Sequence, residues 1–390
     1  MPIFNFKNEY DDVLEYMKSN DFYFENVTFL ESFDFIPSNL EQNLTFKNCS
    51  FKTKELDLGD EEKISSEFKR RDIYFNTCSF RSVRFRDLSK INDVTFSSSK
   101  IIELNIGYGS KLPSTLDIVG DNAVVNTLRI IDTHLNTKII LRLQRLDYLE
   151  ISRVHNSGFL SVVSYTGTRI LYIEEFLNFD YFEMDGMKNK SKLSGRFYMG
   201  HNSFGNANFN ESDFSSYNRF IYLNNNISEL TCTDSKWKSN NLNMTNSEVL
   251  EYFRDIKNLL TNGSAEYQKF NRSFLDSLFK YSNYQDKMIL IFSKLISNHC
   301  TSWLLPIIWL FIINVLTIHF MNLSLSNKLV TFQDITVLLN PLHLNKHYSL
   351  WGQLESQITN QFVLIDIISR AFNAAVIYHL VKTFRRFHTS

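Results

Sequence analysis

The chain lacks the motifs on which many enzymes and nucleic-acid-binding proteins depend. It has 12 glycines in 390 residues, and none falls in a GxGxxG, GxxxxGK[ST] or GxSxG pattern. The sequence therefore predicts neither a phosphate-binding loop nor a nucleophile elbow. Its formal net charge is -1, so no overall basic field attracts nucleic acid. We expect no nucleic-acid partner.

Cysteine is also scarce, and the spacing of the cysteines argues against two further kinds of structural feature. No CxxC pair occurs, which argues against a zinc site and a disulfide framework. His343 and His347 have the HxxxH spacing of a helical metal site, but Pro341 lies just before them and no Glu follows the first His. We interpret them as loop histidines and expect no metal or other cofactor. The four cysteines are Cys49, Cys78, Cys232 and Cys300.

Carboxylate clusters of the kind used in polysaccharide cleavage have a simpler explanation here. The acidic run DLGDEEK (57–63) is typical of a solvated loop, and adjacent Glu174 and Glu175 would point to opposite faces of a strand. The N-terminal segment is acidic where an export signal needs a basic region and an apolar run. We therefore expect the chain not to be an enzyme and its N-terminus to be cytoplasmic.

What the sequence does contain is an apolar residue at every fifth position, most clearly in residues 44–56 and 73–85. In a helix, side chains share a face every three to four residues, and in a strand every two. Neither structure produces a sustained period of five residues. A four-sided coil does, because the middle residue of each short side points to the axis and successive coils stack as parallel strands. The positions are Phe24, Phe29; Phe46, Phe51, Leu56; Phe75, Phe80, Phe85; Ile91, Phe96, Ile101, Ile106; Phe209, Phe214; and Cys232, Trp237, Leu242.

Two consecutive five-residue units, ANFNE (207–211) and SDFSS (212–216), resemble the pentapeptide-repeat family. The unit of that family is a small residue, Asn or Asp, a central Leu or Phe and two variable polar residues, and CSFKT (49–53) is similar to it. The resemblance implies a β-solenoid, a right-handed parallel β-helix, over residues 21–245. Residues 1–20 would then form an N-terminal cap.

The middle of the predicted solenoid is less regular. Between residues 107 and 200 the five-residue period of apolar residues is lost. Strand-like runs about twenty residues apart replace it, as expected for stacked coils. LQRLDYLEI (143–151) is also typical of a leucine-rich repeat, so a horseshoe solenoid is the alternative there.

The pattern becomes helical from residue 246. Residues 247–297 carry apolar stripes at helical spacing, which predicts an amphipathic helical linker over 246–299. Residues 303–321 contain no Asp, Glu, Lys or Arg and are long enough to cross a hydrocarbon core of about 30 Å. Trp303 and Trp309 fit the aromatic anchors of a membrane interface. We interpret this segment as a transmembrane helix rather than a buried one.

A second candidate span covers residues 361–381. Its Asp366 and Arg370 lie four residues apart, and Asn373 falls on the same side of a helix. Charges within a membrane are costly unless they pair or line water, so the segment either faces a bundle or pore or lies on the surface as an amphipathic helix. The first span offers two candidate polar partners, Asn314 and His319.

The distribution of basic residues predicts the orientation. Positive charges flank the outer ends of the two segments, whereas the loop 322–360 has few, which places both termini in the cytoplasm. We therefore expect a multi-pass protein of the inner membrane, in contact with bilayer lipid, whose loop segment 329–344 lies outside or re-enters. The flanking cations are Lys287, Lys294 and Lys382, with Arg385 and Arg386 as further interfacial anchors.

The order of these parts resembles pentapeptide-repeat proteins that end in an ion-channel-like module of two spans. The resemblance is carried by SNHCTSWLLP (297–306), LLNPLHL (338–344) and YHLVKTFRRF (378–387). It implies a membrane module over residues 300–390. No TVGYG-like filter occurs, so potassium selectivity is not implied.

Two functional hypotheses follow. Two helices cannot enclose a channel within one chain, so conduction requires a homo-oligomer. The first hypothesis is a bacterial sensor and effector whose solenoid binds a protein partner and whose membrane module permeabilises the membrane, in stress or phage defence. The alternative is a non-conducting, membrane-tethered interaction scaffold.

Overall fold

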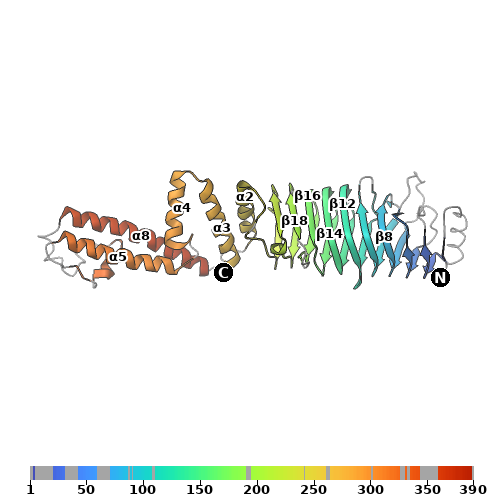
Figure 1. Cartoon of the computed structure of the whole chain (residues 1–390), viewed down its shortest axis with the longest axis horizontal. Helices are drawn as coiled ribbons and strands as arrows, with labels where there is room; N and C mark the ends of the chain where they lie inside the picture. Colours follow the sequence, from blue (N-terminus) through green and yellow to red (C-terminus); the bar gives the residue numbers. More distant parts are fainter. Residues whose placement is uncertain are drawn as a thin grey trace. The chain divides into compact units, whose positions relative to one another are not determined.

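The computed structural model divides into two compact units, Met1–Asp255 and Ile256–Ser390 (Figure 1). The first is a parallel β-solenoid and the second is helical. Apart from the short strand β1 (Ile3–Phe4), the expected N-terminal cap at 1–20 lies outside the described residues. The structure describes residues 3–4, 21–30, 43–58, 71–86, 88–89, 91–107, 110–189, 195–240, 242–260, 264–299, 302–325, 330–331, 334–342 and 359–388.

The solenoid consists of two parallel sheets with 11 and 10 strands. Successive strands alternate mainly between the sheets, and each pairs with strands of the neighbouring coils. The first sheet contains β1, β3 (Thr28–Phe29), β5 (Ser50–Phe51), β6 (Leu56–Leu58), β8 (Ser79–Phe85), β10 (Lys100–Ile106), β12 (Val124–Leu135), β14 (Arg145–Asn156), β16 (Ile170–Asn178), β18 (Arg196–Gly200) and β20 (Arg219–Leu223). The second contains β2 (Tyr23–Glu25), β4 (Leu44–Lys47), β7 (Arg71–Asn76), β9 (Ile91–Ser97), β11 (Thr115–Val119), β13 (Lys138–Leu143), β15 (Phe159–Ser164), β17 (Tyr181–Asp185), β19 (Ala207–Asn210) and β21 (Leu230–Thr233).

The irregular middle region continues the same two sheets. Strands β11 to β18 alternate between them with parallel register, as when β14 pairs with β12 and β16. A leucine-rich horseshoe would instead alternate one strand with a helical segment. The solenoid prediction therefore holds for the described residues between 107 and 200, and the horseshoe alternative does not describe them.

The period of five places rings in register inside the coil. Phe46 stacks on Phe24 of one neighbouring coil and on Phe75 of the other, with ring centroids 5.1 and 5.0 Å apart. Phe75 stacks in turn on Phe96 at 4.7 Å. These separations are close to the spacing of hydrogen-bonded strands, about 4.7–4.9 Å, so each coil can add one ring to this stack.

The corners of the coil use left-handed backbone. Asn48, Thr77 and Ser98 occupy corresponding corners of successive coils with φ of 53°, 55° and 49°. The N–H of Asn48 donates to the Asn76 carbonyl at 2.9 Å, and that of Thr77 to the Ser97 carbonyl at 2.8 Å. These bonds to the next coil offset the steric cost of a left-handed residue, which Asn tolerates best.

Helix α2 (Asn246–Leu259) covers the last coil. The ring of its Tyr252 lies 5.2 Å from that of Phe220 and 5.1 Å from that of Tyr222. The Tyr252 hydroxyl donates to the Lys238 carbonyl at 2.7 Å. The start of the predicted helical linker thus belongs to the solenoid unit, where it shields the end of the hydrophobic core as a solenoid cap does.

The helical unit is built around two long helices, α5 (Leu304–Ser324) and α8 (Asn360–His388), which pack side by side (Figure 1). Helices α3 (Ala265–Tyr281) and α4 (Tyr284–Ser297) precede them, and the short helix α6 (Ile335–Leu338) lies between them in sequence. The side chain of Asn283 caps α4 by accepting the N–H of Asp286 at 2.9 Å. Asn298, with a left-handed backbone, ends α4 and turns the chain toward α5.

Candidate functional site

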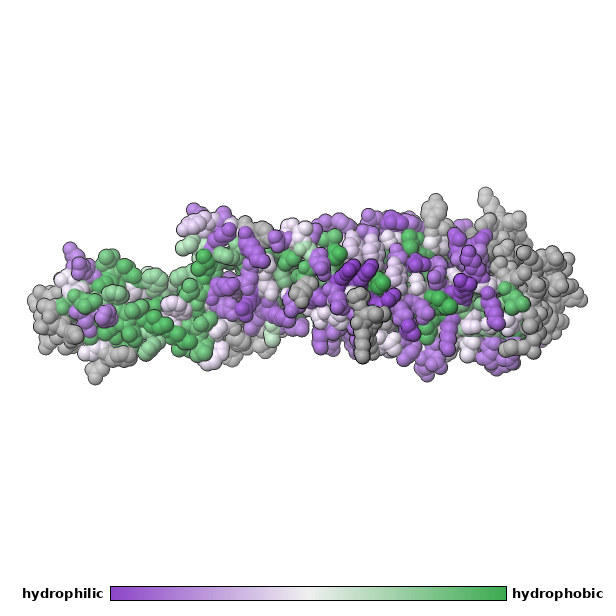
Figure 2. Space-filling model, viewed as in Figure 1, coloured by the Kyte–Doolittle hydropathy of each residue, from purple (hydrophilic) through white to green (hydrophobic). Residues whose placement is uncertain are grey.

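Helices α5 and α8 are long and apolar enough to cross a membrane. Only 22% of the apolar window of each helix is buried within the structure, whereas the core helix of a soluble protein is mostly buried. Apolar residues dominate the surface of this hairpin and polar residues that of the solenoid in Figure 2. The exposed side chains include Leu304, Ile308, Phe311, Leu316, Leu323, Leu364, Ile367, Ile368, Phe372 and Tyr378.

The interior of the hairpin contains two fully buried amides, Asn314 of α5 and Asn373 of α8. Each side-chain nitrogen donates to the side-chain oxygen of the other at 3.2 Å. Asn314 also donates to the carbonyl of Leu310 at 2.6 Å, and Asn373 to that of Leu338 at 2.9 Å. All four amide hydrogens of the pair are thereby used, and the reciprocal bonds fix the register of the two helices.

This amide pair lies deep within the hairpin. Asn314 stands midway along α5, about 15 Å from either end at 1.5 Å per residue. Asn373 lies about 20 Å from the start of α8 by the same rise. Leu338 is the last residue of α6, so its carbonyl comes from the connecting segment and not from a long helix. The connection therefore folds back along the hairpin to the depth of the amide pair.

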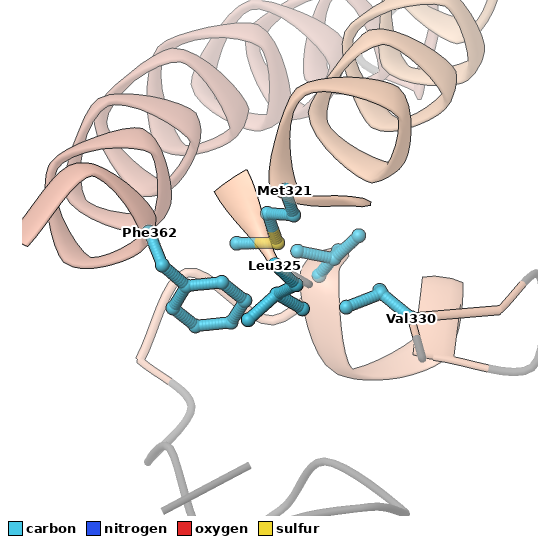
Figure 3. Packing of buried hydrophobic residues seen from close by; sticks show 5 residues of the cluster. Met321, Leu325, Val330 and Phe362 are labelled. Atoms are coloured by element: carbon cyan, nitrogen blue, oxygen red, sulfur yellow. The ribbon is translucent and has the colours of Figure 1, made fainter. Parts of the chain in front are cut away.

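Apolar packing holds this fold-back segment, residues 330–331 and 334–339, against the ends of the long helices. Met321, Leu325, Val330, Leu338 and Phe362 form one buried cluster, four of whose members are labelled in Figure 3. The side chain of Asn322 adds two bonds to the backbone of Val330. It accepts the N–H at 3.0 Å and donates to the carbonyl at 2.8 Å.

A buried ion pair lies one turn before Asn373 on α8. Arg370 donates to the carboxylate of Asp366. The Asp366 side chain is 4% exposed and that of Arg370 is 27% exposed, so the carboxylate is enclosed while the arginine side chain is partly exposed. Ser369, between them in sequence, is also buried. Pairing offsets the cost of removing both charges from water.

The other predicted polar residue and the predicted anchors lie apart from this cluster. His319 is on the exposed side of α5, with its ring 5.7 Å from that of Phe320. Trp303 is exposed at the start of α5, and the indole N–H of Trp309 donates to the Leu295 carbonyl of α4 at 2.9 Å.

Of four further predicted positions, only Arg385 is placed with its side chain. Arg385 is exposed near the end of α8, whereas the side chain of Arg386 lies outside the described part of the structure. His343 and His347 also lie outside it. Within the described residues, no group of three or more His, Cys, Asp or Glu is placed to hold a metal ion.

Sequence reasoning missed two contacts of the module. It did not foresee that Asn373 reaches the carbonyl of Leu338, nor that Ser297 Oγ and His379 Nδ1 lie 3.1 Å apart and join α4 to α8. The only signal in the sequence was the presence of polar residues in apolar segments, which indicates that each needs a partner but not which one. Comparisons with protein-family models, curated proteins and solved structures found no match.

Proposed function

We propose that this chain is a membrane-anchored effector of bacterial cells. The β-solenoid binds a protein partner in the cytoplasm, and several copies of the two-helix module together permeabilise or conduct across the inner membrane. In this arrangement α5 and α8 span the bilayer and both termini face the cytoplasm.

The observation that carries the proposal is the fold-back segment, whose Leu338 carbonyl bonds Asn373 about 20 Å along α8. Lipid cannot satisfy backbone polar groups, so the carbonyls at the end of a helix as short as α6 are tolerated at membrane depth only where protein buries them or where they line a water-filled cavity. A simple two-helix anchor needs no such segment. Modules that conduct do use broken helices and loops at this depth.

Conduction requires more than one copy, because two helices cannot surround a pore. The exposed sides of α5 and α8 provide apolar surface for contacts between copies and with lipid. Arg370, whose side chain is partly exposed beside the enclosed Asp366, is the residue we assign to the water-facing side.

The solenoid supports a binding role through its regular outer surface. On the first sheet, Tyr172 and Tyr198 stack at 4.6 Å, and the Tyr198 hydroxyl donates to Glu174 at 3.0 Å. In strands β12 and β14 of the same sheet, Arg153 pairs with Asp132 of the neighbouring coil. Such extended, repetitive surfaces suit protein partners. A right-handed, pentapeptide-repeat-like coil and a use in stress or phage defence are part of this proposal.

A non-conducting tether is the second candidate, and one observation favours it. The Asn314–Asn373 pair is closed on itself inside a single hairpin, as expected for an amide pair that only fixes helix packing. On this account Asp366 and Arg370 also serve packing alone.

The test is membrane potential and dye entry in bacteria that express the full chain, compared with a version truncated after Asn298. An effector depolarises cells only when the helices are present. Replacing Asp366 and Arg370 together by Leu then abolishes depolarisation while the chain stays in the membrane fraction. A full chain that enters membranes and leaves the potential unchanged, even when copies are crosslinked through the solenoid, would favour the tether.

A further inference from the structure

Helix α4 carries an apolar stripe that the other described elements leave partly exposed. Tyr284, Met288, Ile291 and Leu295 recur at intervals of four, three and four residues, which places them on one side of the helix. Their exposed fractions are 78%, 51%, 41% and 51%. A stripe of this periodicity normally packs on a protein core, so its exposure calls for an occupant.

The position of α4 on the hairpin is fixed by polar contacts. The indole of Trp309 on α5 bonds the Leu295 carbonyl, and Ser297 bonds His379 of α8. In Figure 1, α4 runs across the direction of α5 and α8. If those two helices cross a bilayer, α4 lies roughly parallel to its surface.

The stripe is continuous with the apolar surface of the two long helices. Met288, Ile291 and Phe292 line a groove of about 570 Å³, to which α5 and α8 also contribute. Its walls are apolar except for Thr317 and Ser369. Whatever surrounds α5 and α8 beside this groove therefore also contacts the side of α4 that carries the stripe.

We propose that the cytoplasmic leaflet of the bilayer is the occupant: α4 lies in the interface with its stripe toward the acyl chains, and acyl chains fill the groove. This inference rests on the membrane insertion of α5 and α8 in the proposed function. Its physical basis is that an amphipathic helix parallel to the surface buries its apolar side at the boundary between headgroups and acyl chains. Lys287 and Lys294, seven residues apart, lie along one side of the stripe. Lys294 pairs with Asp276 of α3 at 2.6 Å, and the long side chain of Lys287 can reach the headgroups.

The experiment uses the full chain with its native cysteines replaced by Ser. At Cys78 this change is conservative, because Ser99 stands at the equivalent corner and donates to a carbonyl in the same way. Single cysteines are then introduced by Met288→Cys on the stripe, Gln285→Cys away from it and Leu316→Cys at mid-depth of α5. Each carries an environment-sensitive dye in phosphatidylethanolamine–phosphatidylglycerol vesicles. Nitroxide quenchers are attached to the lipid near the headgroup or near the end of the acyl chain.

We expect the dye at 288 to shift to the blue and to lose more emission with the headgroup-proximal nitroxide than with the deep one. The dye at 285 should show neither effect, and the dye at 316 should be quenched most by the deep nitroxide. If 316 is quenched and 288 is not, the inference is overturned while the spans remain. A blue shift at 288 without quenching by either lipid would mean that protein covers the stripe, which also overturns it.

A dye at 288 that is quenched most by the deep nitroxide would contradict an interfacial position. If 316 is quenched by neither lipid, the insertion assumed in the proposed function fails, and this inference fails with it. The two failures are therefore distinguished by the dye on α5.

Discussion

The solenoid and the α5–α8 hairpin place their apolar side chains on opposite sides. In the solenoid, Phe46 and Phe75 lie inside and the outer surface is largely polar. In the hairpin, Phe311 and Ile367 lie outside, each 57% exposed, while the amides of Asn314 and Asn373 are buried. An interior of stacked rings suits a fold in water, and an apolar exterior around a polar interior suits one in lipid.

The two regions also satisfy their backbones differently. Each solenoid strand bonds to neighbouring coils, as when β10 pairs with β8 and β12, so its end needs a cap such as α2. The long helices satisfy their backbones internally, and the buried carbonyl of Leu338 in the fold-back segment accepts a hydrogen bond from Asn373. A backbone satisfied within helices suits a bilayer, whereas a sheet edge that needs a cap does not.

The largest effect is expected in the solenoid core. Phe75→Ala should lower the free energy of unfolding by about 3–5 kcal/mol, because it removes ring contacts and leaves a cavity. The control Tyr74→Ala, on the exposed side of the same strand, should cost about 0.5 kcal/mol or less. Denaturant unfolding of the detergent-solubilised full chain, followed by the circular dichroism of its β-structure, measures both. Equal losses of stability in the two variants would contradict the placement of Phe75 inside the solenoid and Tyr74 outside it.

Charge on the exposed side of α5 should have the next largest effect. Leu316→Asp should oppose insertion by about 2.5–3.5 kcal/mol at the centre of a span. The matched control is Ile102→Asp on the outside of β10, since the two side chains are 48% and 51% exposed. The fraction of chain retained in alkali-washed membranes should fall for the first variant only. Full retention of Leu316→Asp would show that this side of α5 faces water.

Breaking the amide pair should have a smaller effect. Asn314→Leu or Asn373→Leu alone should cost about 1–3 kcal/mol, because each leaves a buried amide without its partner. Asn373→Leu should cost more, since it also frees the Leu338 carbonyl. The double variant should lose less stability than the two single variants lose together. Unfolding of the chain by denaturing detergent tests this cycle, and additive losses would argue against a direct pair.

The smallest effect is a pH dependence near the start of α5. Burial lowers the pKa of His299, against the opposing pull of the Asp276 carboxylate 3.6 Å away. Below the unfolded pKa of about 6.5 the unfolded chain then binds more protons than the folded one, so stability falls as pH falls.

His299→Gln should flatten that part of the pH profile of the helical unit. Asp255, in the solenoid unit, should give a pH dependence of stability of the opposite sign. Burial raises its pKa, so its contribution is present at low pH and is lost as pH rises. Thermal unfolding of the full chain from below the unfolded Asp pKa of about 3.9 up to pH 8, with helix and sheet signals followed separately, measures the two. An unchanged profile for His299→Gln would contradict the assignment.

The sequence alone determined the elements whose signal is periodic. Apolar residues at every fifth position predicted a coil of stacked strands, and the rings of Phe46, Phe75 and Phe96 do stack inside it. The uncharged run 303–321 predicted a helix long enough to span, observed as α5. Such patterns are local, because the repeat of the backbone dictates which side chains share a face.

Only the tertiary structure decided which distant residues meet. The pairing of Asn314 with Asn373, the return of Leu338 to that pair and the contact of Ser297 on α4 with His379 on α8 join segments far apart in sequence. The same holds for residues 107–200, where continuous pairing in two sheets decided between two kinds of solenoid. A polar residue in an apolar segment indicates that a hydrogen-bond partner is needed. Which residue becomes that partner depends on how the chain packs.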